Sequence, residues 1–258
     1  MPLKAEKKWG QSHIYLKSAI SKLHPSFSQM VETMNDLKFY EKISIIDKLC
    51  LSNNPKRFSR SDFWNVGFAL NTTKKNRNSA KISARKSKFC LILGPKEGLN
   101  KDLYEINRFI SKTPELDIYQ VNSSSALEDA LVEKYIFAHP LRATDFNVSC
   151  EKIISPYEDL EGSEYFPIII DNHYYFSDQY CSLKEPLTLL YAIAVCNAKK
   201  YDKILVAGFP LDHGRSDFME IQSFGKLIDP ELNKKIVHIT PTNCNFGTKS
   251  NIFMGLSD

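Results

Sequence analysis

The chain has 258 residues, of which 43% are hydrophobic, so it can bury a real core and is not disordered as a whole. No stretch approaches the roughly 18 uncharged apolar residues of a membrane span, and the charged start MPLKAEKK is unlike a secretory signal peptide. We therefore expect a cytoplasmic protein without a membrane span.

The net charge of +4 hides a division of the chain near residue 86. Residues 1–86 hold 17 Lys or Arg against 6 Asp or Glu, a net +11, whereas residues 87–258 hold 17 against 24, a net −7. The six cysteines are scattered, with no CxxC pair and no histidine at zinc-finger spacing. We expect reduced, mostly packed thiols and no metal site.

Residues 1–70 carry apolar side chains at roughly helical spacing. The pattern predicts two helices that meet at His24-Pro25, a third over 39–51 and a fourth that a serine could cap. We expect a small all-helical module. Its apolar faces need to be buried, and a second copy of the chain or another partner would bury them.

Residues 71–87 are expected to be a basic linker. The segment NTTKKNRNSAKISARKSK (71–88) holds seven basic residues, no acid and no apolar period. A nucleic-acid-binding arm is the alternative interpretation, but no aromatic residue lies between the charges and the domain that follows is acidic. We therefore favour the linker and expect no nucleic acid partner.

From residue 88 onward, short apolar runs alternate with helical stretches. This pattern predicts a Rossmann-like α/β domain over residues 88–258, with a mostly parallel sheet covered by helices on both faces. The predicted strands are 88–94, 118–122, 134–138, 152–156, 166–171, 203–209 and 235–241. A helix is predicted after the first strand, and 186–198 predicts a second helix that is apolar on nearly all sides.

In such a sheet the ligand lies beyond the carboxyl ends of the strands, where the strand order reverses. The candidate ligand-binding residues are those that follow the strands: Gly94, Pro95, Lys96, Gly98, Asn122, Ser123, Arg142, Asp212, Thr240 and Thr242. The first loop could direct backbone N–H groups at a nucleotide phosphate. It matches neither the GxxxxGK nor the GxGxxG pattern, so a plain turn explains its glycines equally well.

The other loops offer polar side chains with two interpretations each. Asn122 could bond a base or a ribose, while the serines behind it could simply cap a helix. Arg142, close to His139, could bind a carboxylate or phosphate or pair with a structural acid. His213 beside Asp212 could act as a general base, although charges on a surface loop are common.

His173, Tyr174 and Tyr175 form a further polar and aromatic run. Such side chains would suit sugar stacking, but tyrosines are also common in strands.

The order of the strand ends resembles a known family. The motifs that carry the resemblance are LILGPKEG, QVNSSS, FAHPLR, PLTLLYAIAV, ILVAGF and ITPT. In this order they resemble the carboxy-terminal Rossmann-like domain of aldolase-like proteins from surface-polysaccharide gene clusters. More distantly they resemble family 42 bacterial sialyltransferases and flagellin-glycosylation proteins. Residues 9–27 look like the segment that, in the aldolase-like proteins, follows a metal-dependent barrel of the hydroxymethylglutaryl-CoA lyase type.

The chain departs from these families where activity is concerned. The barrel and its metal ligands are missing, so lyase chemistry is not expected from this chain alone. Lys96 or Glu97 stands where the family usually has a serine, and Pro210 stands where it has an acid. Glu185-Pro186 replaces the serine-glycine pair that begins the long helix of the sialyltransferases, which adds Glu185 to the candidate ligand-binding residues.

Three hypotheses remain open. The first is a domain that binds a nucleotide or nucleotide-sugar in surface-polysaccharide biosynthesis, of the nonulosonate-sugar type, beside an aldolase-like barrel or partner. The second is a sialyltransferase-like glycosyltransferase that uses a cytidine-nucleotide sugar, with His213 or His139 as base and a tyrosine near the departing phosphate. The third is a non-catalytic scaffold that assembles through the helical module, with a second copy of the chain or with an aldolase-like partner. No cofactor beyond a nucleotide-sugar ligand is indicated.

Overall fold

The computed structural model describes residues 80–122, 127–138, 149–156, 162–170, 172–185, 187–211 and 218–250. All of them belong to one compact unit of the chain. The predicted helical module and the first part of the predicted linker lie outside the described residues. No helix in the described ranges is long and apolar enough to cross a membrane.

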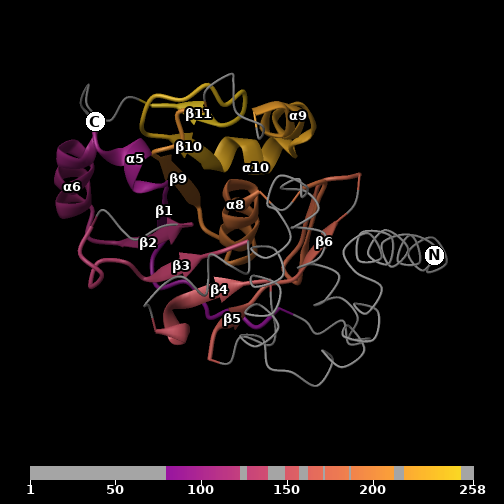
Figure 1. The fold of residues 1–258 in the computed structure, drawn as a ribbon, viewed down its shortest axis with the longest axis horizontal. Helices are drawn as coiled ribbons and strands as arrows, with labels where there is room; N and C mark the ends of the chain where they lie inside the picture. The colour runs from indigo at the N-terminus through magenta and orange to yellow at the C-terminus, as the bar shows by residue number, and fades with distance from the viewer. Residues whose placement is uncertain are drawn as a thin grey trace, which may run out of the picture. The chain divides into compact units, whose positions relative to one another are not determined.

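An eight-stranded parallel sheet forms the centre of the described unit (Figure 1). Its strands, in spatial order, are β11 (Thr248–Lys249), β10 (Ile236–His238), β9 (Lys203–Ala207), β1 (Phe89–Leu93), β2 (Leu116–Val121), β3 (Lys134–Ile136), β4 (Ile153–Ser155) and β5 (Glu164–Tyr165). Every ladder between these strands is parallel. The predicted Rossmann-like α/β fold is confirmed.

Helices cover both faces of the central strands (Figure 1). Their bounds are α5 (Lys96–Leu99), α6 (Leu103–Lys112), α8 (Thr188–Ala198), α9 (Phe218–Leu227) and α10 (Pro230–Lys235), with a 3-10 turn η3 at Cys150–Lys152. Leu91 and Leu93 of β1 pack with Ile106 of α6, whereas Cys90, on the other face, contacts Cys196 of α8. Successive side chains of a strand point to opposite faces, so β1 is buried under α6 on one side and α8 on the other.

A second, three-stranded sheet follows β5 in the chain. Its order is β6 (Ile168–Ile170), β8 (Cys181–Leu183) and β7 (Tyr175–Phe176), with β6 and β8 parallel and β7 antiparallel. The strand predicted over 166–171 is therefore present but belongs to this smaller sheet. An apolar run indicates a buried strand but does not say which strand lies beside it.

Residues 81–88, at the end of the segment predicted to be a linker, form what we call the strap along the amino-terminal edge of the sheet. Lys81 exchanges two backbone hydrogen bonds with Tyr165 of β5, of 2.7 and 3.0 Å. The backbone N–H of Lys86 donates to the Asp117 carboxylate at 3.0 Å. The strap thus crosses from the edge strand β5 to the start of β2 through specific contacts.

His238 ends β10 and is 2% exposed, with its ring centroid 5.3 Å from that of Phe246. Its Nε2 is buried and has no hydrogen-bond partner within the described part of the chain. Burial lowers the pKa of His238 to about 4, a hydrogen bond with the Phe246 backbone opposes this shift, and the charge of Lys249 adds to it. The folded domain therefore holds a neutral imidazole.

This neutral histidine predicts acid-sensitive folding. Since the folded-state pKa is about 4 and the unfolded value near 6.5, the unfolded chain binds the proton first, and stability present above pH 6.5 falls as the pH drops toward 4. We expect a loss of about 3 kcal/mol from this residue alone. Urea denaturation at several pH values should show a weaker pH dependence in His238→Phe than in the wild type. His173→Phe, at an exposed position, is the control, and equal pH profiles for all three proteins would refute the assignment.

Candidate functional site

The order of the strands reverses between β1 and β9. The chain runs from β1 through β2 to β5 on one side and then returns to place β9, β10 and β11 on the other. A parallel sheet wound in this way leaves its ligand crevice at the carboxyl ends of the two strands that flank the reversal. The predicted site residues must therefore be sought around Gly94 and Gly208, which follow these strands.

Three glycines meet at this reversal. A Cβ on Gly94 would lie 2.2 Å from the carbonyl oxygen of Gly208, and a Cβ on Gly98 would lie 2.3 Å from the same atom. Gly208 itself has φ +78°, in the left-handed region that favours glycine. The glycines let the turn after β1 pack backbone to backbone against the turn after β9.

The amide groups of this turn have acceptors inside the chain. Gly94 N–H donates to Ala207 O at 2.8 Å, and Gly98 N–H donates to Pro95 O at 2.8 Å. Lys96 begins α5, and its side chain lies outside the described part of the structure. The predicted phosphate contact from the Gly94 and Gly98 N–H groups therefore competes with hydrogen bonds that already exist.

The two predicted threonines hold the turn after β9. The buried Oγ1 of Thr240 accepts from Gly208 N–H at 2.9 Å, and Thr242 Oγ1 donates to Phe209 O at 2.6 Å. Both hydroxyls are thus engaged with backbone. They fix the backbone of the turn after β9.

Gln120 of β2 joins the same edge, although we did not single it out from the sequence. Its buried side-chain Nε2 donates to Gly94 O at 2.8 Å. Its position within the apolar strand IYQVN could have identified it, because a buried polar side chain needs a hydrogen-bond partner. Gln120 fastens the end of β1 to β2.

Asn122, directly after β2, has a left-handed backbone and, in the part of the chain that the structure describes, a partly unpaired side chain. Its φ is 54°, a left-handed value that few non-glycine residues adopt, asparagine being among those that do. Its Nδ2 donates to Thr188 Oγ1 at 2.6 Å. Its Oδ1 is buried and has no hydrogen-bond partner within the described residues.

Helix α8 starts beside Asn122, at Thr188. Within the described residues no side chain caps this helix end, and its first turn contains no acid. The N–H groups of a helix's first turn have no acceptor inside the helix and carry partial positive charge, so they favour an anion. Glu185 precedes the helix as an exposed residue, and its carbonyl accepts from Leu187 N–H at 2.8 Å.

Five predicted site residues lie outside the described residues: His139, His213, Ser123, Arg142 and Asp212. The suggested bases of a glycosyltransferase are among them, so their geometry adds nothing to that hypothesis. Of the aromatic run, His173 and Tyr175 are exposed, while the Tyr174 hydroxyl donates to the Glu220 carboxylate on α9. Burial is the main cause that raises the pKa of Tyr174 above its usual range, and the hydrogen bond to Glu220 raises this pKa further.

The described residues contain no group of three or more metal-ligating side chains close enough to hold a metal ion. Comparison of the chain with protein-family models, with curated proteins and with solved structures found no match. The proposed function therefore rests on the contacts at the carboxyl edge of the sheet.

The glycine contact predicts a sharp steric test. Gly94→Ala should lower the free energy of unfolding by about 3 kcal/mol, since its Cβ would overlap backbone that cannot rotate away. Gly225→Ala is the control: the three atoms nearest to its Cβ belong to the exposed side chain of Asn245, which can move at the cost of its hydrogen bond to Gln222 O, so we expect a change within about 1 kcal/mol. Urea denaturation measures both. Equal stability of the two variants would contradict the packing role.

Proposed function

We propose that the carboxyl edge of the sheet binds a nucleotide or a nucleotide-sugar. The observation that carries this proposal is the buried Oδ1 of Asn122, which has no partner within the described residues. Leaving a buried acceptor unpaired costs about 1–3 kcal/mol, and the left-handed backbone of Asn122 adds strain. A ligand that donates a hydrogen bond to this oxygen would offset that cost.

The neighbouring groups define the chemistry of the ligand. Asn122 Oδ1 can only accept, so it requires a donor such as a ribose hydroxyl or an exocyclic amine of a base. The start of α8, joined to Asn122 through Thr188, can only donate and favours an anion. A nucleotide carries both kinds of group within one small molecule.

The position of these groups supports the same conclusion. The register pairs Leu93 with Gln120 and with Ala207, so the turns after β1, β2 and β9 lie side by side at the switch point. Nucleotides bind at this place in doubly wound folds. The resemblance of the strand-end motifs to proteins of surface-polysaccharide clusters leads us to propose a nucleotide-sugar of nonulosonate type, used beside an aldolase-like barrel or partner.

Calorimetry with a panel of nucleotides and nucleotide-sugars tests the proposal. The wild-type chain should bind at least one of them, and Asn122→Ala should weaken that binding about tenfold or more, since a hydrogen bond from the ligand is lost. Asn107→Ala, the same substitution at an exposed position of α6, should bind like the wild type.

Two outcomes would count against the proposal. Absence of binding for the whole panel would remove it. Equal affinity of Asn122→Ala and wild type would leave a binding protein but place the ligand elsewhere.

A further inference from the structure

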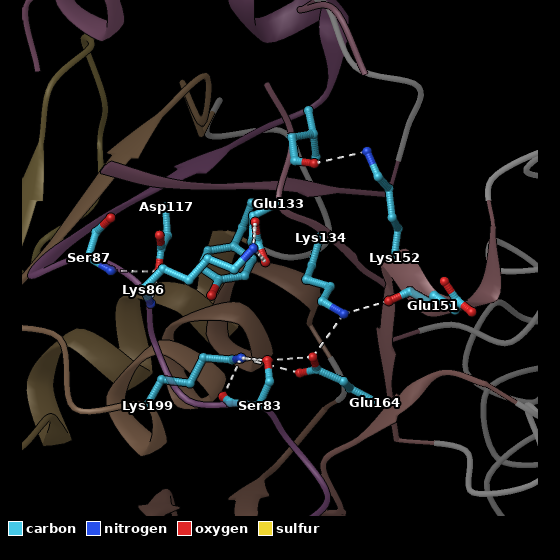
Figure 2. A network of polar contacts seen from close by, with 12 residues as sticks. Ser83, Lys86, Ser87, Asp117, Glu133, Lys134, Glu151, Lys152, Glu164 and Lys199 are labelled. Atoms are coloured by element: carbon cyan, nitrogen blue, oxygen red, sulfur yellow. Dashed lines mark hydrogen bonds and ion pairs between the residues drawn. The ribbon is translucent and has the colours of Figure 1, made fainter. Parts of the chain in front are cut away.

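The strap contacts the carboxyl end of α8. Lys199, the residue that follows the helix, donates from Nζ to Ser83 O at 2.8 Å and to Ser83 Oγ at 3.2 Å. The same ammonium pairs with Glu164 at 3.2 Å (Figure 2). One side chain thus ties the helix end to the strap and to the edge strand β5.

A second contact holds the same helix end. The Arg85 guanidinium donates to the carbonyl oxygen of Lys200 and pairs with Asp202 at 2.9 Å. Carbonyl groups at a helix's carboxyl end lack donor partners inside the helix and carry partial negative charge, so a cation stabilises them. Lys200 lies two residues beyond α8, at φ 62°, so Arg85 holds the turn that leaves the helix.

The two contacts differ in strength. The Lys199 side chain is 2% exposed and that of Glu164 is 12% exposed. Removing Glu164 would leave the Lys199 charge buried without this partner, and removing Lys199 would leave Glu164 with Lys134. Arg85 and Asp202 have side chains that are 32% and 55% exposed, and water screens such a pair. The strap is therefore held more strongly at Ser83 than at Arg85.

Helix α8 connects these strap contacts to the carboxyl edge of the sheet. Every residue of the helix except Asn197 is buried, and the helix contacts β1, β2 and β9. A close-packed interior has few voids to absorb a displacement, so a shift at one end of a buried helix reaches the other end. At that other end, Thr188 accepts the hydrogen bond from Asn122.

We propose that the strap is a latch on α8: its grip on Lys199 and Lys200 sets the position of the helix, and the helix position sets the contact between Thr188 and Asn122. Loss of the strap contacts would thereby alter the carboxyl edge of the sheet. The consequence for ligand binding rests on the proposed nucleotide site, but the coupling itself is measurable without any ligand.

The decisive comparison is between Lys199→Met and Lys134→Met in the full chain. Lys134 of β3 pairs with the same carboxylate, Glu164, at 2.9 Å, and none of its polar contacts within the described residues is with the strap or α8. Both substitutions remove one cation from Glu164. Only Lys199→Met removes the contact between Ser83 of the strap and the end of the helix.

Two measurements on these variants report on the latch. In Lys199→Met, hydrogen exchange at the strap and at Tyr191, whose N–H bonds the carbonyl of Leu187 at the start of α8, should become about tenfold faster or more. The side-chain amide resonance of Asn122 should move in the ¹H–¹⁵N spectrum. Lys134→Met should leave both unchanged. No change in Lys199→Met, or equal changes in the two variants, would overturn the latch.

Arg85→Gln keeps the proposal testable if Lys199→Met fails to fold. It removes the exposed contact and leaves the buried pair intact, so the fold should persist while the Asn122 resonance moves in the same direction by a smaller amount. An unmoved Asn122 resonance in this variant would then overturn the latch. Failure of every nucleotide to bind the wild type would remove the proposed function and leave the coupling standing.

Discussion

Backbone contact between Gly94 and Gly208 determines the geometry of the carboxyl edge. These residues follow β1 and β9, the two strands that flank the reversal of strand order. The turns can approach this closely only because neither residue has a Cβ. Gln120 then fastens Gly94 from β2, and Thr240 fastens Gly208 from the end of β10. The ends of β10, β9, β1 and β2 are thus held together by direct contacts.

The two edges of the sheet differ in how their polar groups are satisfied. At the amino edge, Lys199, Lys134 and Ser83 all converge on the Glu164 carboxylate (Figure 2). Burial raises the pKa of Glu164, but these hydrogen bonds and charges outweigh it, so the net shift is downward. At the carboxyl edge, Asn122 holds a buried acceptor without a partner in the described residues, beside a helix start with no capping side chain there. Saturated contacts suit a structural edge, and unsatisfied ones suit a ligand site.

The sequence predicted the parts of the fold that leave a strong local pattern. The runs that became β1 and β9 are apolar because both faces of these strands are buried, and α8 reads as apolar all round because ten of its residues are buried. The two-residue strands β5, β7 and β11 are too short to show alternation. Their pairing depends on chain segments far away in sequence.

The site was only partly readable for the same reason. Asn122 stood out because it follows a strand, yet its left-handed backbone and its partner Thr188 belong to the folded state. The glycines at 94 and 98 suggested either a phosphate contact or a plain turn, whereas their close partner, Gly208, lies in a distant turn. The basic residues of the strap suggested a solvated linker, and their acidic partners, such as Glu133 and Asp202, come from other elements. Local sequence does not reveal such long-range pairs.

The proposed function requires that a nucleotide binds at the carboxyl edge of the sheet. A ¹H–¹⁵N titration of the labelled chain with nucleotides, added one at a time, tests it most directly. We expect saturable shifts that are largest at Asn122, Thr188 and Gly208. Shifts confined to the amino edge around Asp117, or no saturable shift with any nucleotide, would contradict it.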